Sequence, residues 1–263
     1  MRGVFDGYAD YYDLLYRDKD YAGEARYLQS LLARHGKTRG AFLDLGCGTG
    51  RHALELVRLG FDGLGIDASA RMIGHARERV PRDLAHRLTF EIGDVRSARL
   101  GRRFDAVLAL FHVASYQTTN EDLAAMLATV REHLAPDGVF VCDFWHGPGV
   151  LRDPPHARVK TVEDARGRVT RIAEPRIRAA DHCVDVAYTL LVERGVSDAM
   201  TRLTETHRVR YLFLHELRRL LADAGLRLGA AEAWMGGELG EASWNGVITA
   251  GHCPRSTEPD AAG

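Results

Sequence analysis

The sequence predicts an α/β fold, a doubly wound parallel sheet with an inserted antiparallel β-sheet. Three observations carry this prediction. Short apolar runs alternate with amphipathic segments through the first 150 residues, a glycine-rich turn follows the first apolar run, and β-like segments succeed one another without helices in the second half. Alternating strands and helices are typical of a sheet that is covered by helices on both faces.

The α/β part is built from strand–helix units that follow an N-terminal helix. Apolar residues recur at helical spacing through residues 21–35, which predicts an amphipathic helix there. Further helices are predicted at about 49–59, 69–79 and 120–134, and strands at 41–45, 61–66, 88–92, 104–111 and 139–144. The fourth of these strands is apolar on both faces, as a central parallel strand is. Asn120 is placed to cap the helix that follows it.

The second half of the chain changes in character. β-like segments are predicted at 159–162, 169–177, 184–192 and 200–211, followed by a helix at 213–224 and closing strands at 226–233 and 245–250. We therefore expect four parts: an N-terminal lid with the ligand-binding α/β core (1–150), an antiparallel β insertion (151–211), the closing elements of the core (212–253) and a disordered tail (254–263).

The composition is that of an ordinary soluble globular protein. The chain has 263 residues, of which 46% are hydrophobic and 27% charged, and its net charge is −1. This balance gives no general attraction to nucleic acid or to an anionic membrane. No apolar run has the length of a signal peptide core or a membrane span. The four widely spaced cysteines indicate reduced thiols in a cytoplasmic protein without zinc.

The turn "DLGCGTG", residues 44–50, predicts a site for a ligand without a pyrophosphate. A dinucleotide fingerprint would need its last glycine where Arg51 stands, which disfavours NAD. Asp44, at the end of the preceding strand, would repel a pyrophosphate but suits a cationic ligand. S-adenosylmethionine is such a ligand, with a sulfonium, an amino group and no phosphate. A sharp turn lets the backbone at Gly48 and Gly50 approach it closely.

Two further acids extend the predicted cofactor site. Asp67 ends the second strand, where its carboxylate can accept hydrogen bonds from both ribose hydroxyls, and Asp94 follows the third strand, placed to accept from the adenine amino group. Met72 and Leu110 are placed to sandwich the ring. The predicted cofactor-binding residues are Tyr12, Asp44, Gly46, Cys47, Gly48, Asp67, Ala68, Met72, Asp94, Val95 and Leu110.

The motif D-x-G-x-G-x-G, followed by an acid at the second strand and G-D at the third, resembles the class I S-adenosylmethionine-dependent methyltransferases over about residues 40–144. This resemblance implies a seven-stranded Rossmann-like methyltransferase sheet. In addition, "YYDLLYRDKDYAGEA", the β-rich stretch 155–211 and "ETHRVRYLF" are similar to bacterial methyltransferases that act on nucleotide-linked aminosugars. That similarity implies that Tyr12 and Tyr16 cover the cofactor and that Trp145 and His207 approach the substrate.

Methyl transfer is an in-line displacement, so alignment and exclusion of water supply much of the rate enhancement. An amine acceptor needs only to arrive neutral, whereas a hydroxyl acceptor usually needs a base such as histidine. Candidate catalytic residues are His112, His146, His207 and Tyr16. The tyrosines at residues 8, 11, 12 and 16 have helix-like spacing and predict a lid over residues 8–21, since aromatic rings attract a sulfonium.

The predicted substrate site takes its residues from loops and from the insertion. Tyr116 and Gln117 form a polar wall after the fourth strand, and Tyr116 stands where the aminosugar group has a histidine. Arg208 and Arg210 share one face of the "ETHRVR" strand and suit a diphosphate through bidentate hydrogen bonds. Together with Trp145 these are the predicted substrate-binding residues. No clustered acids indicate a metal site.

The sequence therefore predicts a methyltransferase that uses S-adenosylmethionine to methylate an amine, or a hydroxyl, of a small polar metabolite, preferably a nucleotide-linked sugar. Two alternatives stay open. One is an O-methyltransferase of another small-molecule natural product with a histidine base, and the other is a non-catalytic S-adenosylmethionine-binding subunit. We expect a monomer or homodimer, and neither nucleic acid nor membrane as a partner.

Overall fold

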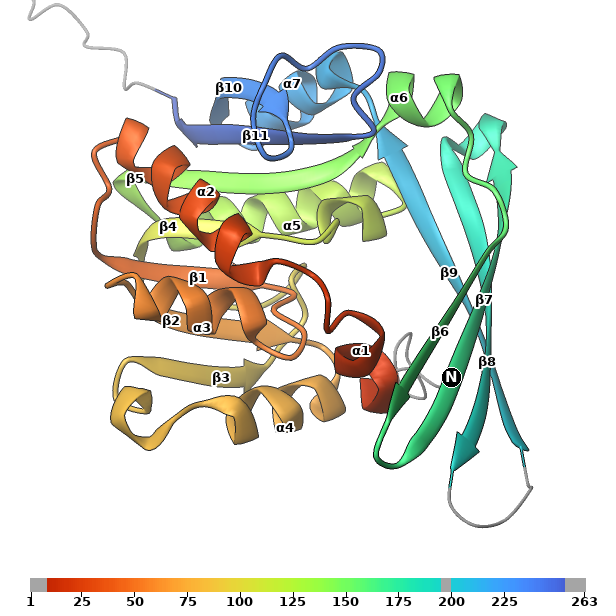
Figure 1. Cartoon of the computed structure of the whole chain (residues 1–263). Helices are drawn as coiled ribbons and strands as arrows, with labels where there is room; N and C mark the ends of the chain where they lie inside the picture. Colours follow the sequence, from red (N-terminus) through yellow and green to blue (C-terminus); the bar gives the residue numbers. More distant parts are fainter. Residues whose placement is uncertain (1–8, 195–199, 254–263) are drawn as a thin grey trace, which may run out of the picture.

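The computed structural model describes residues 9–194 and 200–253 and has the predicted α/β architecture with an inserted antiparallel sheet. Parallel strands β1 to β5 pair in the order β3-β2-β1-β4-β5, and β11 and β10 continue this core sheet beyond β5, with β11 antiparallel to both neighbours (Figure 1). The core strands are β1 (Ala41–Leu45), β2 (Asp62–Asp67), β3 (Leu88–Ile92), β4 (Phe104–Ala109), β5 (Leu134–His146), β10 (Leu226–Ala233) and β11 (Asn245–His252).

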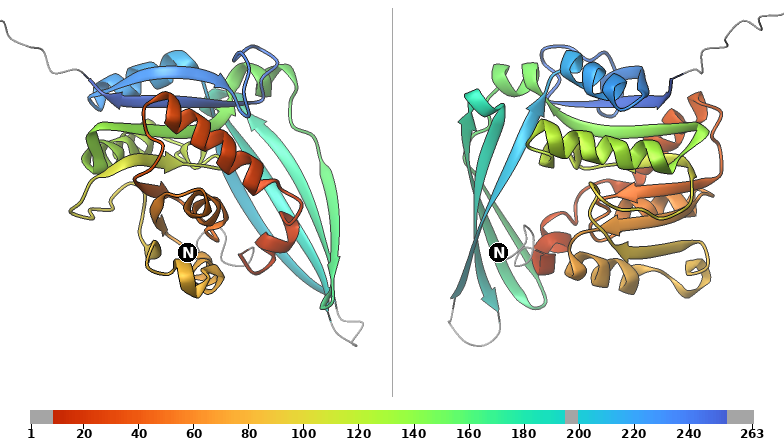
Figure 2. Two further views of the ribbon diagram at one scale, coloured as in Figure 1. Left: turned by 60° about the vertical axis from the view of Figure 1, so that its left-hand side comes forward. Right: turned by 180° about the vertical axis from the view of Figure 1, so that it is seen from behind.

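Helices cover both faces of the core sheet (Figure 2). Apolar side chains of α2, α3 and α4 form one core cluster with the sheet, and those of α5 and α7 form the other. Their bounds are α2 (Tyr21–Arg34), α3 (Arg51–Arg58), α4 (Ala70–Arg79), α5 (Asn120–His133) and α7 (Leu214–Asp223). The cap of α5 is Thr119, not Asn120 as expected: the Thr119 hydroxyl accepts from the backbone N–H of Asp122 at 3.0 Å.

The insertion is a sheet of four long antiparallel strands that stands beside the carboxyl ends of β1 to β4 (Figure 1). These strands are β6 (Arg158–Asp164), β7 (Gly167–Arg178), β8 (Cys183–Arg194) and β9 (Met200–Leu212). The end of β9 pairs with the end of β5 through Trp145–Tyr211 and His146–Leu212, so the inserted sheet is joined to the core sheet. From Leu203 to Val209 along β9 the side chains alternate between a more buried inner face and an exposed outer face, and from Arg210 to Leu212 all are buried.

A short helix, α1 (Ala9–Leu15), lies between the core and the inner face of the inserted sheet (Figures 1 and 2). Leu15 is fully buried among Val162 of β6, Val169 of β7 and Leu190 of β8. The predicted lid therefore packs on the inserted sheet, although its residue Tyr8 lies outside the described residues, as does the predicted tail 254–263. The remaining helices are α6 (Gly147–Arg152), η1 (Arg82–Leu84), η2 (Ala114–Tyr116) and η3 (Ala179–Asp181).

Among the described helices, none is long and apolar enough to cross a membrane.

Candidate active site

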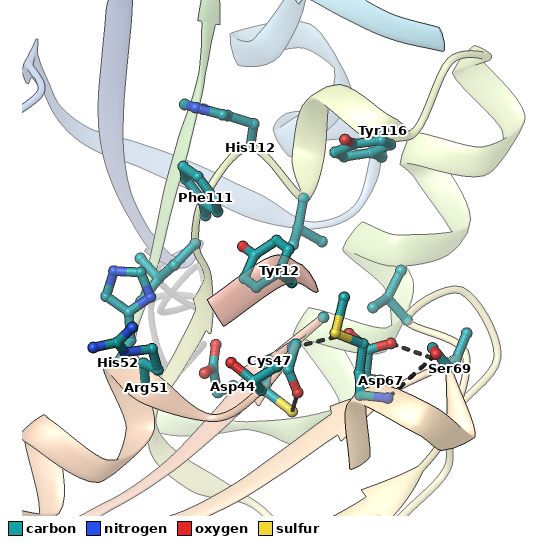
Figure 3. Close-up of a pocket in the computed structure, with 18 of the residues that line it drawn as sticks. Tyr12, Asp44, Cys47, Arg51, His52, Asp67, Ser69, Phe111, His112 and Tyr116 are labelled. Carbon is teal, nitrogen blue, oxygen red and sulfur yellow. Dashed lines mark hydrogen bonds between the residues drawn. The ribbon is translucent and has the colours of Figure 1, made fainter. Parts of the chain in front are cut away.

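A cavity of about 550 Å³ opens where the carboxyl ends of the core strands face α1 and the inserted sheet (Figure 3). Most of the predicted site residues line it, although they come from distant segments. The predicted residues on its walls are Tyr12, Tyr16, Asp44, Gly46, Cys47, Gly48, Asp67, Ala68, Met72, Asp94, Val95, Leu110, His112, Tyr116, Gln117, Trp145 and His207. The structure thus brings the predicted cofactor set together in one place.

The glycine turn forms the floor of this cavity. Gly46 has a φ of +69°, and a Cβ there would lie 2.6 Å from a methyl carbon of Val113, so another residue would be both strained and crowded. At Gly48, by contrast, no described atom lies within 4 Å of the position that a Cβ would take. The backbone of Gly48 is therefore open to a ligand that lies against the turn.

Asp67 is held in place by backbone hydrogen bonds at the end of β2. One carboxylate oxygen accepts the N–H of Gly48 at 2.9 Å, and the other accepts the N–H of Ser69 at 2.8 Å. Burial raises the pKa of Asp67, whereas these two hydrogen bonds lower it. A carboxylate that is fixed in this way can accept further hydrogen bonds from a ligand hydroxyl pair.

Asp44 is almost completely buried, with 2% of its surface exposed. Burial, together with the negative charges of Asp67 and Asp143, raises the pKa of Asp44 to about 8. A cation bound in the cavity would offset this repulsion and favour the ionised carboxylate. The floor of the cavity is therefore suited to a positively charged ligand.

The part of the floor beside Asp44 offers groups for a negative charge, and these include two residues, Tyr21 and Arg51, that were not predicted from the sequence. The Tyr21 hydroxyl is buried and has no hydrogen-bond partner among the described residues. The guanidinium of Arg51 lies 4.4 Å from the centre of the Tyr21 ring, and both residues line the cavity. With Asp44 nearby (Figure 3), this part of the floor matches the ammonium and carboxylate of an amino-acid group. The sequence contained one signal for this role: Arg51 stands where a dinucleotide fingerprint needs a glycine, next to the predicted ligand-binding turn.

His52 and Glu24 support this end of the cavity. The His52 Nε2 lies 2.6 Å from a Glu24 carboxylate oxygen, and Lys19 also bonds to Glu24. Burial works against the Glu24 charge, but these two partners together hold the pKa of Glu24 at about 2. The cluster links α2 to α3 beside Arg51.

Asp94 lines the cavity, but its carboxylate already has a partner. Arg96 bonds to both Asp94 oxygens, with its shortest contact at 2.6 Å, and also reaches Asp122 at 2.8 Å. These contacts lower the pKa of Asp94. The backbone N–H of Arg96 also donates to one of these oxygens at 2.9 Å, so an amino group of a ligand would share an Asp94 oxygen with Arg96.

The loop after β4 is strained where it meets the cavity. Phe111 and His112 are consecutive residues with positive φ, at 60° and 70°. Asp143, at the end of β5, accepts the backbone N–H of His112 at 3.1 and 3.2 Å, and the His112 Nδ1 lies 2.8 Å from a carboxylate oxygen of Asp143. This ring contact is an ion-pair distance rather than a well-aligned hydrogen bond, because the ring N–H does not point at the oxygen. Asp143 therefore holds the loop mainly through the backbone N–H of His112, and less through the His112 ring.

Tyr116, from η2, and His207, from β9, meet at the far side of the cavity. The Tyr116 hydroxyl and the His207 Nδ1 are 3.0 Å apart, and the His207 Nε2 lies 3.2 Å from a carboxylate oxygen of Glu205. Burial raises the pKa of Tyr116 and lowers the pKa of His207, so both groups are neutral at pH 7. This hydrogen-bonded chain connects the core with the inserted sheet.

Aromatic rings on α1 and on the β4 loop close the cavity. The ring centres of Tyr12 and Tyr16 are 4.8 Å apart, and that of Tyr16 lies 5.1 Å from Phe111. Asp13 ties α1 to the core, since it accepts the Thr49 hydroxyl at 2.8 Å and pairs with Arg79. The helix thus covers the glycine turn, as the lid prediction requires.

Three predicted residues do not reach the cavity, and strand alternation explains each correction. His207 points inward from β9, so Arg208 and Arg210 point to the opposite face. There Arg208 pairs with Asp185 at 2.6 Å, and Arg210 bonds to Asn120 and Glu216. In the same way Trp145 lines the cavity while its neighbour His146 points away, and the His146 Nδ1 contacts the carbonyl oxygen of Ser243 at 3.0 Å.

Within residues 9–194 and 200–253, no group of three or more His, Cys, Asp or Glu side chains is placed to hold a metal ion.

Comparison with known proteins relates the chain to one class of enzyme. A family described as "Methyltransferase domain" matches residues 42–138. The dTDP-3-amino-3,4,6-trideoxy-alpha-D-glucopyranose N,N-dimethyltransferase of Streptomyces venezuelae is 31% identical over 91% of this chain and 97% of its own length. The dTDP-3-amino-3,6-dideoxy-alpha-D-glucopyranose N,N-dimethyltransferase of Streptomyces fradiae is 31% identical over 91% of this chain and 90% of its own length. The crystal structure of Streptomyces venezuelae DesVI superposes with a TM-score of 0.77 at 28% identity, over 94% of this chain and 98% of that one.

Proposed function

The chain belongs to the S-adenosylmethionine-dependent methyltransferases, and from this premise we propose that it methylates the amine of a nucleotide-linked aminosugar. S-adenosylmethionine, its cofactor, supplies the methyl group on a positively charged sulfur. The observation that carries the substrate class is the extent of the likeness, which spans 91% of this chain and so includes the inserted sheet as well as the cofactor core.

The geometry of the cavity floor supports specific roles toward the cofactor. In this proposal Asp67 accepts the ribose hydroxyls and Asp44 pairs with the amino group. The Tyr21 hydroxyl and Arg51 hold the carboxylate, which would give the buried Tyr21 oxygen the partner it lacks among the described residues. Asp94, in turn, accepts the adenine amino group beside Arg96.

The rest of the cavity suits an amine acceptor. We assign cofactor binding to residues 1–150 and 212–253 and the acceptor face to the insertion, 151–211. The rings of Tyr12, Tyr16 and Phe111 keep water from the transferring methyl group, and Tyr116 and Gln117 give the acceptor polar contacts. An enclosed site that fixes the nucleophile in line gains about 7–11 kcal/mol from alignment. No covalent step by the protein is needed.

The test is an assay with pairs of dTDP-linked sugars that differ only at one carbon, which carries an amine or a hydroxyl. We expect methylated product from the aminosugar only, read by mass spectrometry as a gain of one and then two methyl groups. A matched panel of the free aminosugars, without the nucleotide, reports whether the diphosphate is recognised. Methylation of none of the nucleotide-linked aminosugars would overturn the proposal.

A hydroxyl acceptor is the second candidate, and one contact favours it. His112 lines the cavity, and the buried Asp143 carboxylate, 2.8 Å from its Nδ1, would stabilise the positive charge of the ring if His112 took a proton from a hydroxyl. If the hydroxyl member of a sugar pair is methylated instead, His112→Gln should lower the rate by about 10²-fold or more. For an amine acceptor the same change should have a modest effect.

We further propose that the enzyme works in the cytoplasm as a monomer or homodimer, without nucleic acid. All four cysteines, Cys47, Cys142, Cys183 and Cys253, are free thiols, which supports a reducing compartment. Size-exclusion chromatography with light scattering measures the assembly state.

A further inference from the structure

We propose that Tyr116, His207 and Glu205 form a proton relay that carries the proton of the acceptor amine out of the cavity. The inference rests on the proposed function, since methyl transfer to an amine releases one proton each time. Tyr116 is the catalytic residue of the relay because it faces the cavity, and Glu205 is a positioning residue that acts through His207.

The hydrogen bonds fix the direction of the relay. A carboxylate only accepts, so the Nε2 of His207, 3.2 Å from Glu205, must carry a proton and donate it. In a neutral imidazole the Nδ1 then has no proton, so it accepts from the Tyr116 hydroxyl 3.0 Å away. The Tyr116 oxygen therefore gives its own proton to His207 and keeps only acceptor capacity. An oxygen of this kind is suited to receive an N–H of an amine.

The surroundings of the three groups change from dry to wet along the relay. Tyr116 lies on the cavity wall, the side chain of His207 is 2% exposed and that of Glu205 is 18% exposed. Burial and the positive charge of Arg171 lower the pKa of His207, while Glu205 raises it. The ring of Tyr188 packs 4.8 Å from the imidazole and shields it from one side. A proton that leaves the cavity by this path therefore ends at a carboxylate that reaches solvent.

Each methyl transfer moves one methyl group and one proton. The amine nitrogen forms the new N–C bond, the C–S bond of the cofactor breaks, and its electron pair stays on sulfur. Before this attack the acceptor, bound as an ammonium, releases one proton to the Tyr116 oxygen while the Tyr116 proton moves to the Nδ1 of His207, so that the nitrogen has a free electron pair. The Glu205 carboxylate stabilises the resulting imidazolium. The proton on the Nε2 of His207, which faces Glu205, then passes to water.

The experiment compares Glu205→Gln and Tyr116→Phe with the wild type in single-turnover rates and in cofactor affinity. Glu205→Gln keeps the size of the side chain but removes the charge that stabilises the imidazolium. We expect each change to slow methyl transfer by about 10²-fold, and the double variant to be no slower than either single one, since the residues act as a unit. The cofactor affinity, measured by calorimetry, should stay within about threefold of the wild type. Thr206→Val, on the opposite face of β9, is the matched control and should leave the rate unchanged.

A second readout needs no cofactor or acceptor. In ligand-free protein with ¹⁵N-labelled histidine, the ring-nitrogen shifts of His207, assigned by its loss in His207→Gln, should report a proton on Nε2 and none on Nδ1. A proton on Nδ1 overturns the relay, and so does a rate within about threefold of the wild type in both Glu205→Gln and Tyr116→Phe. A failure of the proposed function appears differently, as wild-type protein that methylates no aminosugar.

Discussion

The two walls of the cavity are built on different principles. The floor comes from the ends of parallel core strands, where backbone hydrogen bonds fix the Asp67 carboxylate and strand pairing fixes the backbone of Asp44. The opposite wall comes from the inner face of an antiparallel sheet, where single side chains such as Tyr188 and His207 decide the chemistry. A site made by backbone ends tolerates few changes, whereas a site made by one face of a strand can be altered at each second residue. The predictions below separate these two walls.

The largest effect is expected on the floor. Asp67→Ala removes a carboxylate that is proposed to hold two ribose hydroxyls, and it should weaken S-adenosylmethionine binding by about 1.5–3 kcal/mol. Calorimetry measures this loss. Asp62→Ala is the matched control, because Asp62 begins the same strand, is exposed and pairs with Arg87 away from the cavity. Equal affinities of the Asp67 variant and the wild type would break the assignment of the floor.

The second effect is a pH dependence of cofactor binding. The pKa of Asp44 is raised to about 8 by burial and by two neighbouring acids, so this carboxyl is largely protonated at pH 7 in the free protein. A cation gains from Asp44 only when the carboxyl is ionised, so affinity should fall as pH decreases below 8, by at most about tenfold per unit. At pH 7 binding should release a proton, which calorimetry in buffers of different ionisation enthalpy detects. Asp44→Asn should abolish this dependence.

The same raised pKa of Asp44 predicts how the stability of the ligand-free protein depends on pH. In the unfolded chain the carboxyl of Asp44 ionises near pH 4, whereas in the folded protein it keeps its proton up to about pH 8. The folded state thus binds more protons between these values, and this residue lowers stability progressively as pH rises through that range. Asp44→Asn should therefore raise the Tm at pH 8 more than at pH 5. A Tm that is equally changed at both values would contradict the raised pKa.

A smaller effect on cofactor binding than that of Asp67→Ala is expected from a change in α1, which lies between the two walls. Asp13 bonds to Thr49 and Arg79, so Asp13→Ala should loosen the lid and weaken cofactor binding by about 1–2 kcal/mol. Limited proteolysis should cut residues 9–20 of the variant faster, and bound cofactor should restore less protection than in the wild type. Asp18→Ala, whose side chain is 68% exposed, is the control. Unchanged cleavage and affinity would leave α1 as packing only.

The smallest effect is expected on the outer face of the inserted sheet. Arg208 pairs with Asp185 there and does not line the cavity, so Arg208→Ala should change the KM for a nucleotide-linked acceptor by less than about twofold and stability by less than about 1 kcal/mol. Steady-state kinetics and thermal melting measure both. A rise in KM of tenfold or more would show that the acceptor reaches the outer face.

The sequence allowed the floor to be predicted because a parallel sheet puts strand-ending residues at one edge. Asp44, Asp67 and Asp94 all line the cavity, and their positions at the ends of three strands bring them together there without any side-chain contact between them having to be known. The residues of the opposite wall were harder to predict. Alternation along β9 is evident in the sequence, and it excludes His207 and Arg208 from sharing one face, but the sequence does not say which of the two faces inward.

The other site residues that differ from the prediction are also explained by tertiary contacts and strand alternation. Tyr21 acquires its role through a contact with Arg51 in another segment of the chain, which no local pattern reports. Glu205 lies only two residues from His207 on β9, but this pair is linked to the cavity wall through the contact of His207 with Tyr116, which is far away in the chain. His146 ends a core strand like a ligand-binding residue, but it alternates with Trp145 and so turns toward Ser243.

The joint between β5 and β9 has an evolutionary consequence. Among the residues that the structure describes, only the register pairs Trp145–Tyr211 and His146–Leu212 connect the inserted sheet to the core sheet by strand pairing. Substitutions on the inner face of the insertion can therefore accumulate without disturbing the pairing of β1 to β5. A lineage with this architecture can diversify in the molecules that it accepts while its donor-binding half stays under purifying selection, so paralogues should differ most at the inward positions of β7, β8 and β9.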